Sequence, residues 1–424
     1  VVVGDQHADA LVFEGGDDFL EVGHGDRVDA RERLVEQENL WFGDERPADF
    51  GAPSFAARER IRGVIGEMGD PEFLHETVCA GAALCARAVH PRIAELPLGP
   101  LVLVDDVTAA LQRLAAKLRE LWPGWLVAVT GSAGKTTTKE LVSAVLATAG
   151  PVLRTEGNLN NHWGVPITLL GLRPEHRMAV IEMGMNHAGE IAALAAIARP
   201  NACVITNAGS AHLENLGSLE AIAREKASLA WAVKRGEPAF AAADSPRLLA
   251  ALAGAPARVI SYGLARGAAV RPDQLEDLGD AGSRFTVAGF PPVHLRLIGL
   301  HQVANALAAL AVARELKLDP AAVVAALEAH RPLKGRMEIR HAGGATLLVD
   351  YYNANPDSMR AALATLAGWP RATRRIAVLG DMRELGETAA QLHREVGEAV
   401  RAAELWVVGE HAADYAAGAA RSGR

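Results

Sequence analysis

Short apolar runs alternate with amphipathic segments through the middle of the chain. Apolar runs at 126–130, 178–183 and 202–206 predict buried strands, because each is short and ends at a polar or glycine-rich turn. Segments with apolar residues at helical spacing predict helices at 190–198, 219–233 and 303–316. Strands that alternate with helices in this way are typical of a parallel sheet covered by helices on both faces.

The same alternation continues after Pro332 on a smaller scale. Strands are predicted at 346–349, 376–379 and 405–408, with a helix between the first two. Asn355 can cap that helix, Pro356 suits its first position, and Gly368 ends it. This region predicts a second, smaller α/β domain of Rossmann-like type.

The N-terminal part is less regular. Glycine and acidic residues dominate 15–26, whereas 73–89 predicts a helix, a break at Gly81 and a strand. A proline-punctuated, strand-like segment at 96–106 leads into a helix at 107–121. We therefore predict an α/β protein of three domains: 1–97, 98–331 and 332–424.

Composition narrows the class of protein. A length of 424 residues agrees with about three domains, and 50% hydrophobic with 22% charged residues is typical of a globular chain. The net charge of -8 argues against nonspecific binding to nucleic acid or membranes. The three cysteines (Cys79, Cys85 and Cys203) are too few for a disulfide framework, and no apolar run reaches membrane-spanning length. We expect a cytoplasmic location.

The loop after the first central strand has the composition of a phosphate-binding loop. Its small residues would let backbone N–H groups approach phosphate oxygens, and the following helix N-terminus adds positive potential. Lys135 can reach the terminal phosphates and Thr136 can bind Mg²⁺. The spacing is shorter than in the common G-x-x-x-x-G-K-[ST] motif, since Val129 stands in place of the first glycine. The expected nucleotide contacts are Gly131, Ser132, Ala133, Gly134, Lys135, Thr136 and Thr137.

Two more strand ends carry candidate functional groups. Glu182 ends the strand at 178–183, and His212 follows a glycine loop after the strand at 202–206. Because ligands bind at the carboxyl ends of parallel strands, Glu182 is a candidate Mg²⁺ ligand and His212 a second functional residue. The alternatives are a surface glutamate at a turn and a hydrogen-bonded structural histidine. An asparagine-rich loop, 157–161, allows either simple turn formation or amide contacts to a polar ligand.

Several longer motifs then carry a family resemblance. In chain order they are TGSAGKTTTKEL, GNLNNHWGVP, EMGMNHAGEI, TNAGSAHLENLGSLEAIAREK, GLHQVANALAA, KGRMEI, DYYNANPDSM and VLGDMRELGE. Together they resemble the Mur ligase family over about residues 96–410. The YNANPDSM and LGDMxELG stretches resemble the branch of the family that adds D-Ala-D-Ala.

The resemblance implies an ATP-dependent, ADP-forming amide ligase of peptidoglycan synthesis, active as a monomer. The terminal carboxylate of UDP-MurNAc-tripeptide would take the γ-phosphoryl group of ATP, with Mg²⁺ as cofactor. The amine of D-Ala-D-Ala would then attack the acyl phosphate, giving UDP-MurNAc-pentapeptide and phosphate. Phosphoryl transfer depends on positioning and charge neutralisation, which a lysine, Mg²⁺ and a helix N-terminus supply.

The resemblance also implies roles for individual residues. Lys226 matches the family lysine that becomes carbamylated, which would turn a bland helix lysine into an anionic metal-binding group. The implied catalytic residues are Lys135, Glu182, His212 and Lys226, and the implied metal ligands are Thr136, Glu182, His212 and carbamylated Lys226. Further implied nucleotide contacts are Asn305, Arg336, Asp350, Tyr352 and Asn353, and implied substrate contacts are Asn158, Asn160, Asn161 and Asn207.

Some positions depart from the family pattern. Val349 replaces the first of two aspartates, Gln302 replaces an asparagine, and Ser228 replaces a glutamate. The family's UDP-binding motifs are not intact in 1–97, and its C-terminal K-G-S-R stretch has no counterpart. We therefore expect a divergent first domain, and either a truncated third domain or a different mode of acceptor binding. Two alternatives remain open. One is another Mur-type or folylpolyglutamate-type amino-acid ligase, and the other is a nucleotide-binding regulator that has lost ligation.

Overall fold

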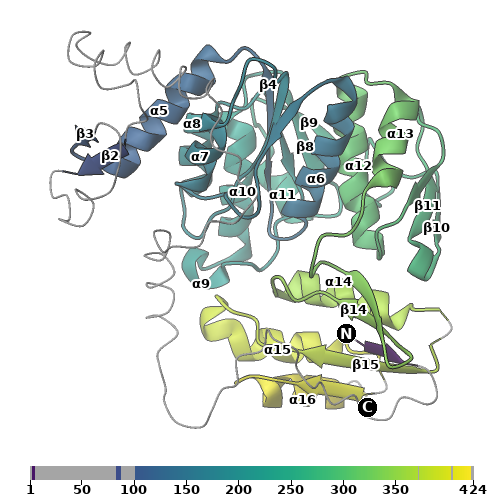
Figure 1. Cartoon of the computed structure of the whole chain (residues 1–424). Coiled ribbons are helices and arrows are strands. Elements are labelled where there is room, and N and C mark those ends of the chain that lie inside the picture. The colour runs from purple at the N-terminus through teal and green to yellow at the C-terminus, as the bar shows by residue number, and fades with distance from the viewer. Residues whose placement is uncertain (1, 5–82, 87–100, 371, 403, 422–424) are drawn as a thin grey trace, which may run out of the picture.

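The computed structural model describes residues 2–4, 83–86, 101–370, 372–402 and 404–421. A central α/β body lies above a smaller C-terminal α/β layer, as Figure 1 shows. The predicted N-terminal domain, 1–97, lies almost entirely outside the described residues. No helix in the described part of the chain is long and apolar enough to cross a membrane.

The central sheet has six parallel strands in the order β5-β6-β4-β7-β8-β9. The strands are β4 (Trp125–Thr130), β5 (Val152–Arg154), β6 (Met178–Glu182), β7 (Ala202–Ile205), β8 (Pro238–Ala242) and β9 (Arg258–Tyr262). The predicted central strands are thus confirmed. Because β4 lies between β6 and β7, the loop after β4 is flanked by the end of β6, where Glu182 stands, and by the loop after β7, which leads to His212.

Helices cover both faces of this sheet because its strands are apolar on both sides. Val127 and Val129 of β4 belong to one core, and Leu126 and Ala128 belong to the other. The first core includes α6 (Lys135–Leu146), α12 (Leu300–Glu315) and α13 (Pro320–Ala329). The second includes α5 (Val107–Leu121), α7 (Gly164–Leu170), α8 (Glu190–Ala198), α10 (Leu219–Ala232) and α11 (Pro246–Ala251), with the short α9 (Leu213–Leu216) packed beside it.

Two small sheets adjoin the central body. After β9 the chain forms an antiparallel sheet of β10 (Gln274–Asp277), β11 (Ser283–Thr286) and β12 (Val293–Leu295), which the strand–helix pattern did not predict. Its Phe285 and Val293 are buried in the first core, so the sheet extends that core past the parallel strands. The other sheet pairs β2 (Ala83–Ala86) with β3 (Leu101–Val104) in parallel.

The C-terminal sheet has the order β13-β14-β1-β15-β16. Its strands are β13 (Glu338–Ala342), β14 (Ala345–Val349), β1 (Val2–Gly4), β15 (Arg374–Leu379) and β16 (Glu404–Val407), and its helices are α14 (Pro356–Ala367), α15 (Ala389–Glu398) and α16 (Ala412–Arg421). Only β15 and β16 pair in parallel. The sheet is therefore more antiparallel than predicted, because β13 and β14 form a hairpin at two glycines of positive φ, Gly343 and Gly344.

Helix α14 begins and ends where its sequence signals predict. The Asn355 side chain accepts a hydrogen bond from Ser358 N, and the Ser358 hydroxyl accepts one from Asn355 N, which together form a capping box. Pro356 occupies the first turn and Gly368 is the C-cap. This cap fixes the start of α14 at the boundary with the central body.

Candidate active site

The loop between β4 and α6 is held in a shape that only small residues allow. Gly131 and Gly134 have φ values of +151° and +78°, and a Cβ on Gly134 would lie 2.6 Å from Asn305 Oδ1. Asn207 Oδ1 accepts hydrogen bonds from the backbone N–H groups of Ser132 and Ala133, at 2.8 and 2.9 Å. Contacts within the protein therefore hold the loop in this shape. Asn207, which was predicted to contact the substrate, thus has its side-chain oxygen bonded to the loop.

The predicted site residues gather around a cavity of about 270 Å³ at the carboxyl end of β4. From the central body it is lined by the loop, by Glu182 and by His212, and from the C-terminal layer by Arg336 and Asp350. The predicted residues that line it are Ser132, Ala133, Gly134, Lys135, Thr136, Asn158, Asn160, Glu182, His212, Arg336, Asp350, Tyr352 and Asn353. The cavity thus lies between the two parts of the protein.

A second cavity of about 480 Å³ adjoins the first and shares Gly134 and Arg336 with it. It contains the predicted contacts Thr137, Asn207 and Asn305. Asn305 Oδ1 accepts a hydrogen bond from the Thr138 hydroxyl, and Asn305 Nδ2 donates to Gln302 Oε1 at 2.9 Å. Because it is larger, with a more apolar lining, this cavity suits the base and sugar of a nucleotide whose phosphates lie at the loop.

Glu182 ends β6 as a buried carboxylate, with 2% of its surface exposed. Asn160 Nδ2 donates to Glu182 Oε1 at 2.8 Å, and Glu182 N donates to the Thr155 hydroxyl at 2.9 Å. Glu182 Oε2 is buried and has no hydrogen-bond partner among the described residues. A buried, unpaired carboxylate oxygen is costly unless a cation or donor meets it, so this atom fits a metal ion.

His212 lines the same cavity and contacts the C-terminal layer. Its Nδ1 lies 2.5 Å from Oε2 of Glu384, in the loop between β15 and α15. The contact with His212 lowers the pKa of Glu384 below its usual range. His212 itself has a φ of +62°, an uncommon conformation for a residue with a side chain.

The charge of Lys135 acts on the ionisation of Lys226. Lys135 Nζ donates to Gly131 O at 2.9 Å, and burial lowers the pKa of Lys135 while Glu182 opposes that effect. Burial, and next the charge of Lys135, hold the pKa of Lys226 well below its usual range. Lys226 has 2% of its surface exposed and does not line the described cavity. An uncharged, buried lysine is the form that can react as a nucleophile.

The C-terminal layer contributes side chains to the opposite wall of the cavity. Arg336 Nη2 donates to the Thr136 hydroxyl at 3.0 Å, and its guanidinium stacks 4.1 Å from the ring centroid of Tyr352. Asp350 accepts a hydrogen bond from Met337 N at 3.3 Å, and burial raises the pKa of this carboxyl. Arg336 therefore places a positive charge at the start of α6.

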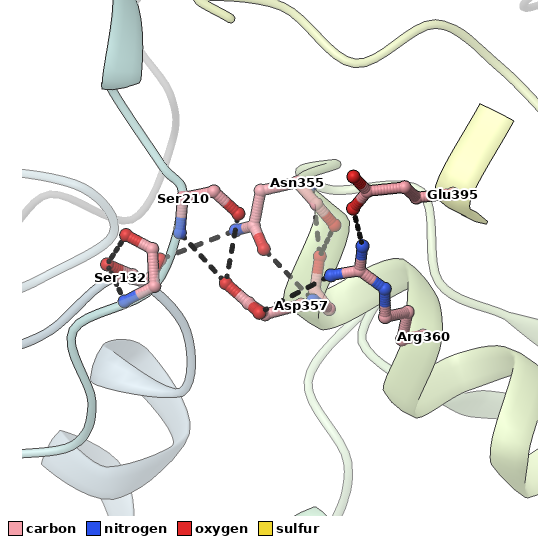
Figure 2. A network of polar contacts seen from close by, with 8 residues as sticks. Ser132, Ser210, Asn355, Asp357, Arg360 and Glu395 are labelled. Carbon is pink, nitrogen blue, oxygen red and sulfur yellow. Dashed lines mark hydrogen bonds and ion pairs between the residues drawn. The ribbon is translucent and has the colours of Figure 1, made fainter. Parts of the chain in front are cut away.

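A polar network joins the two parts near the loop, as Figure 2 shows. Asp357 Oδ2 accepts from the N–H and the hydroxyl of Ser210, and Asn355 Nδ2 donates to Ser132 O at 3.4 Å. Arg360 extends the network to Glu395 of α15 at 2.8 Å. The start of α14 is thereby anchored to the phosphate-binding loop.

Not every predicted residue faces a cavity. Asn161 Oδ1 accepts hydrogen bonds from Trp163 N and Gly164 N at the start of α7, which is the turn role that the sequence left open. Sequence reasoning missed Thr155, Glu384 and Asp357. The last two stand inside the LGDMxELG and YNANPDSM stretches, which was the available signal.

A magnesium ion would have few protein ligands here. No three His, Cys, Asp or Glu side chains converge as a metal cluster in the part of the chain that is described. The residues that could hold the ion are Thr136, Glu182 and His212, which line one cavity. Mg²⁺ usually keeps several waters and binds one or two carboxylates together with substrate phosphates, so this sparse set fits it.

Comparisons with known proteins agree with this geometry. Residues 129–313 match the model of the Mur ligase middle domain, and residues 335–423 match that of the Mur ligase, glutamate ligase domain. The UDP-N-acetylmuramoyl-tripeptide–D-alanyl-D-alanine ligase of Escherichia coli (strain K12) is 37% identical over 346 residues, which are 80% of this chain and 75% of that protein.

Two solved structures are similar over most of the chain. A crystal structure of MurF from Acinetobacter baumannii aligns with a TM-score of 0.73 and 32% identity, covering 83% of this chain and 78% of that one. The MurF ligase of Thermotoga maritima, solved in complex with ADP, aligns with a TM-score of 0.70 and 26% identity, covering 79% of this chain and 84% of that one.

Proposed function

The chain belongs to the Mur ligase family, and from this premise we propose that it joins D-alanyl-D-alanine to UDP-MurNAc-tripeptide with cleavage of ATP to ADP and phosphate. The observation that carries the proposal is the cavity where Lys135 and Glu182 of the central body meet Arg336 of the C-terminal layer. A cavity that holds two cationic side chains and an unpaired carboxylate oxygen suits phosphoryl transfer.

In the proposed reaction, the phosphates of ATP lie along the loop and the α6 N-terminus. Lys135 and Arg336 neutralise charge on the transferred phosphoryl group, and Asn305 and its neighbours hold the nucleoside. The tripeptide carboxylate attacks the γ-phosphorus, the bond to the β,γ-bridging oxygen breaks, and ADP leaves. The amine of the dipeptide then attacks the acyl carbon, and the bond from that carbon to the phosphate oxygen breaks. Phosphate departs, the nitrogen releases a proton to solvent, and an amide remains.

Magnesium is the cofactor that we propose, held by Thr136, Glu182 and His212. A bound Mg²⁺ would supply charge neutralisation for the phosphates. The unpartnered Glu182 Oε2 supports this assignment, since it is a buried anionic oxygen in need of a cation.

Carbamylation of Lys226 is a further part of the proposal. The uncharged amine that burial favours would attack the carbon of CO₂, forming an N–C bond and releasing a proton. The product would be an anion next to the cationic Lys135, which would stabilise it.

Asn158 and Asn160 remain the proposed substrate contacts, and Asn160 also holds Glu182. We also propose a cytoplasmic location, because the reaction consumes ATP and a nucleotide-linked sugar; a monomeric state stays a prediction.

The choice of acceptor tests the proposal. The protein is incubated with ATP, Mg²⁺ and UDP-MurNAc-tripeptide, and D-Ala-D-Ala is compared with single amino acids, glutamate included, as acceptor. We expect a product with the mass of the pentapeptide from the dipeptide alone. Ligation of a single amino acid instead would favour another amino-acid ligase, and ATP binding without any ligation would favour a regulator.

A further inference from the structure

The contact between His212 and Glu384 crosses from the central body to the C-terminal layer. His212 precedes α9 and lines the cavity with Glu182 and Thr136, whereas Glu384 lies in the loop after β15. His212 Nδ1 is buried, and the polar atom that approaches it among the described residues is Glu384 Oε2, which lies at ion-pair distance but outside hydrogen-bond geometry. Within the described part of the chain, Glu384 is therefore the one polar side chain in contact with His212 Nδ1.

The backbone around the pair is also joined. Glu214 N donates to Glu384 O at 3.2 Å, and a Cβ on Gly386 would lie 3.2 Å from Glu214 Cβ. The loop after β15 thus packs closely on α9. Both His212 and Glu384 have left-handed backbone conformations, with φ values of +62° and +60°. Such a conformation persists only where its surroundings hold it, so the carboxylate is placed at the ring by two fixed backbones.

The chemistry of imidazole makes this contact informative. When the N–H group at Nδ1 points at a carboxylate and donates to it, the lone pair of the neutral ring is left on Nε2. Metal-binding histidines commonly have such a carboxylate partner, which fixes the tautomer and the ring orientation and raises the basicity of the ligand.

We propose that Glu384 is a positioning residue that orients His212 for the metal, so that the metal site is complete only when the C-terminal layer is docked on the central body. This inference rests on the proposed function for the presence of the metal. Beyond that function, metal binding and the docking of the loop at 381–386 on the central body should favour each other. The ion would then be held most tightly when the C-terminal layer is docked on the central body as it is here, with both cavities lined from the two parts.

The test measures Mn²⁺ binding to the full chain, with a nonhydrolysable ATP analogue, by electron paramagnetic resonance. Glu384→Ala should weaken Mn²⁺ binding by about 10- to 100-fold, and Glu384→Gln, which keeps the shape but not the charge, should weaken it less. Glu387→Gln is the matched control, because it removes the same charge from an exposed residue in the same loop. We expect it to bind Mn²⁺ like the wild type.

A His212→Gln background separates positioning from simple attraction between charges. If Glu384 acts through His212, then Glu384→Ala should have no added effect on Mn²⁺ affinity in that background. Histidine ¹⁵N spectra should show His212 protonated at Nδ1 in the wild type and not in Glu384→Ala, while unchanged circular dichroism reports that the variant is folded.

Three results would overturn the proposal: a Mn²⁺ affinity within twofold of the wild type in Glu384→Ala, an equal loss in the His212→Gln background, or wild-type affinity in His212→Gln alone. None of these measurements requires turnover. A failure to ligate D-Ala-D-Ala would overturn the proposed function and leave the Mn²⁺ result to decide the role of Glu384.

Discussion

The carboxylate of Asp357 accepts hydrogen bonds from the backbone N–H and the hydroxyl of Ser210, at 2.9 and 3.3 Å, across the boundary between the C-terminal layer and the central body. Ser210 belongs to the loop after β7, and Asp357 to the first turn of α14. A Cβ on Gly209 would lie 1.8 Å from Asp357 Oδ2, so the two elements are in close contact. This contact anchors the C-terminal layer next to the phosphate-binding loop.

Removal of that anchor should weaken nucleotide binding more than it weakens folding. Hydrogen bonds to a charged group contribute about 1.5–3 kcal/mol, and partial exposure of Asp357 places its loss near the low end. Asp357→Ala should therefore lower kcat/KM for ATP by about 5- to 30-fold. Ser210→Ala, which keeps the backbone donor, should cost less. Equal ATP kinetics in Asp357→Ala and the wild type would contradict the role given to the anchor.

Local signals explain why much of the fold was predictable. Contacts within a few residues set the ends of α14, and Asn355, Pro356 and Gly368 make them. Strands β4, β6 and β7 are buried on both faces, so each appears in the sequence as a continuous apolar run. The antiparallel strands at β10–β12 carry only short, mixed patterns, and their pairing depends on the core beneath them.

The cross-domain contacts could not be predicted for a different reason. Ser210 and Asp357 are 147 residues apart in the chain, and their contact depends on how the C-terminal layer packs on the central body. Likewise, Asn160 was predicted to face the substrate, and its contact with Glu182 appears only when β6 is placed beside the loop at 157–161. Motif reading identified the residues at the site but not the contacts among them.

Glu182 should be essential for metal-dependent turnover. Glu182→Gln keeps an oxygen for Asn160 and removes the charge that the unpartnered Oε2 offers to a cation. We expect kcat to fall by at least about 100-fold, with a higher Mg²⁺ concentration needed for half-maximal rate. Phosphate release across a Mg²⁺ series measures both. Glu156→Gln, an exposed glutamate beside the asparagine-rich loop, is the control that should retain the wild-type rate.

Lys226 should make the rate depend on bicarbonate. Burial lowers the pKa of Lys226, which favours the uncharged amine that can react with CO₂. Removal of bicarbonate should slow the wild type, and Lys226→Ala should lose at least about 100-fold in rate and recover part of it with added formate or acetate. Lys234→Ala, an exposed lysine just after α10, should behave like the wild type. A fully active Lys226→Ala would rule out carbamylation as a requirement.

His301 should make stability depend on pH. Burial lowers the pKa of His301 from its ordinary value near 6.5 to about 4. Because the folded pKa lies below the unfolded one, unfolding takes up a proton between pH 6.5 and 4, and stability falls as pH falls through this window. At pH 5 the loss from this residue is up to about 2 kcal/mol. His301→Gln should lose correspondingly less stability between pH 7 and pH 5 in chemical denaturation; an identical pH slope would contradict this.

The central claim is that the loop from Gly131 to Thr136 drives amide ligation with ATP. Phosphate release in the presence of ATP, Mg²⁺, UDP-MurNAc-tripeptide and D-Ala-D-Ala tests it most directly, with Lys135→Ala compared against Lys234→Ala. We expect release that requires both substrates in the wild type and in Lys234→Ala, and none above background in Lys135→Ala. Release at the wild-type rate from Lys135→Ala, or release that ignores the two substrates, would contradict the account.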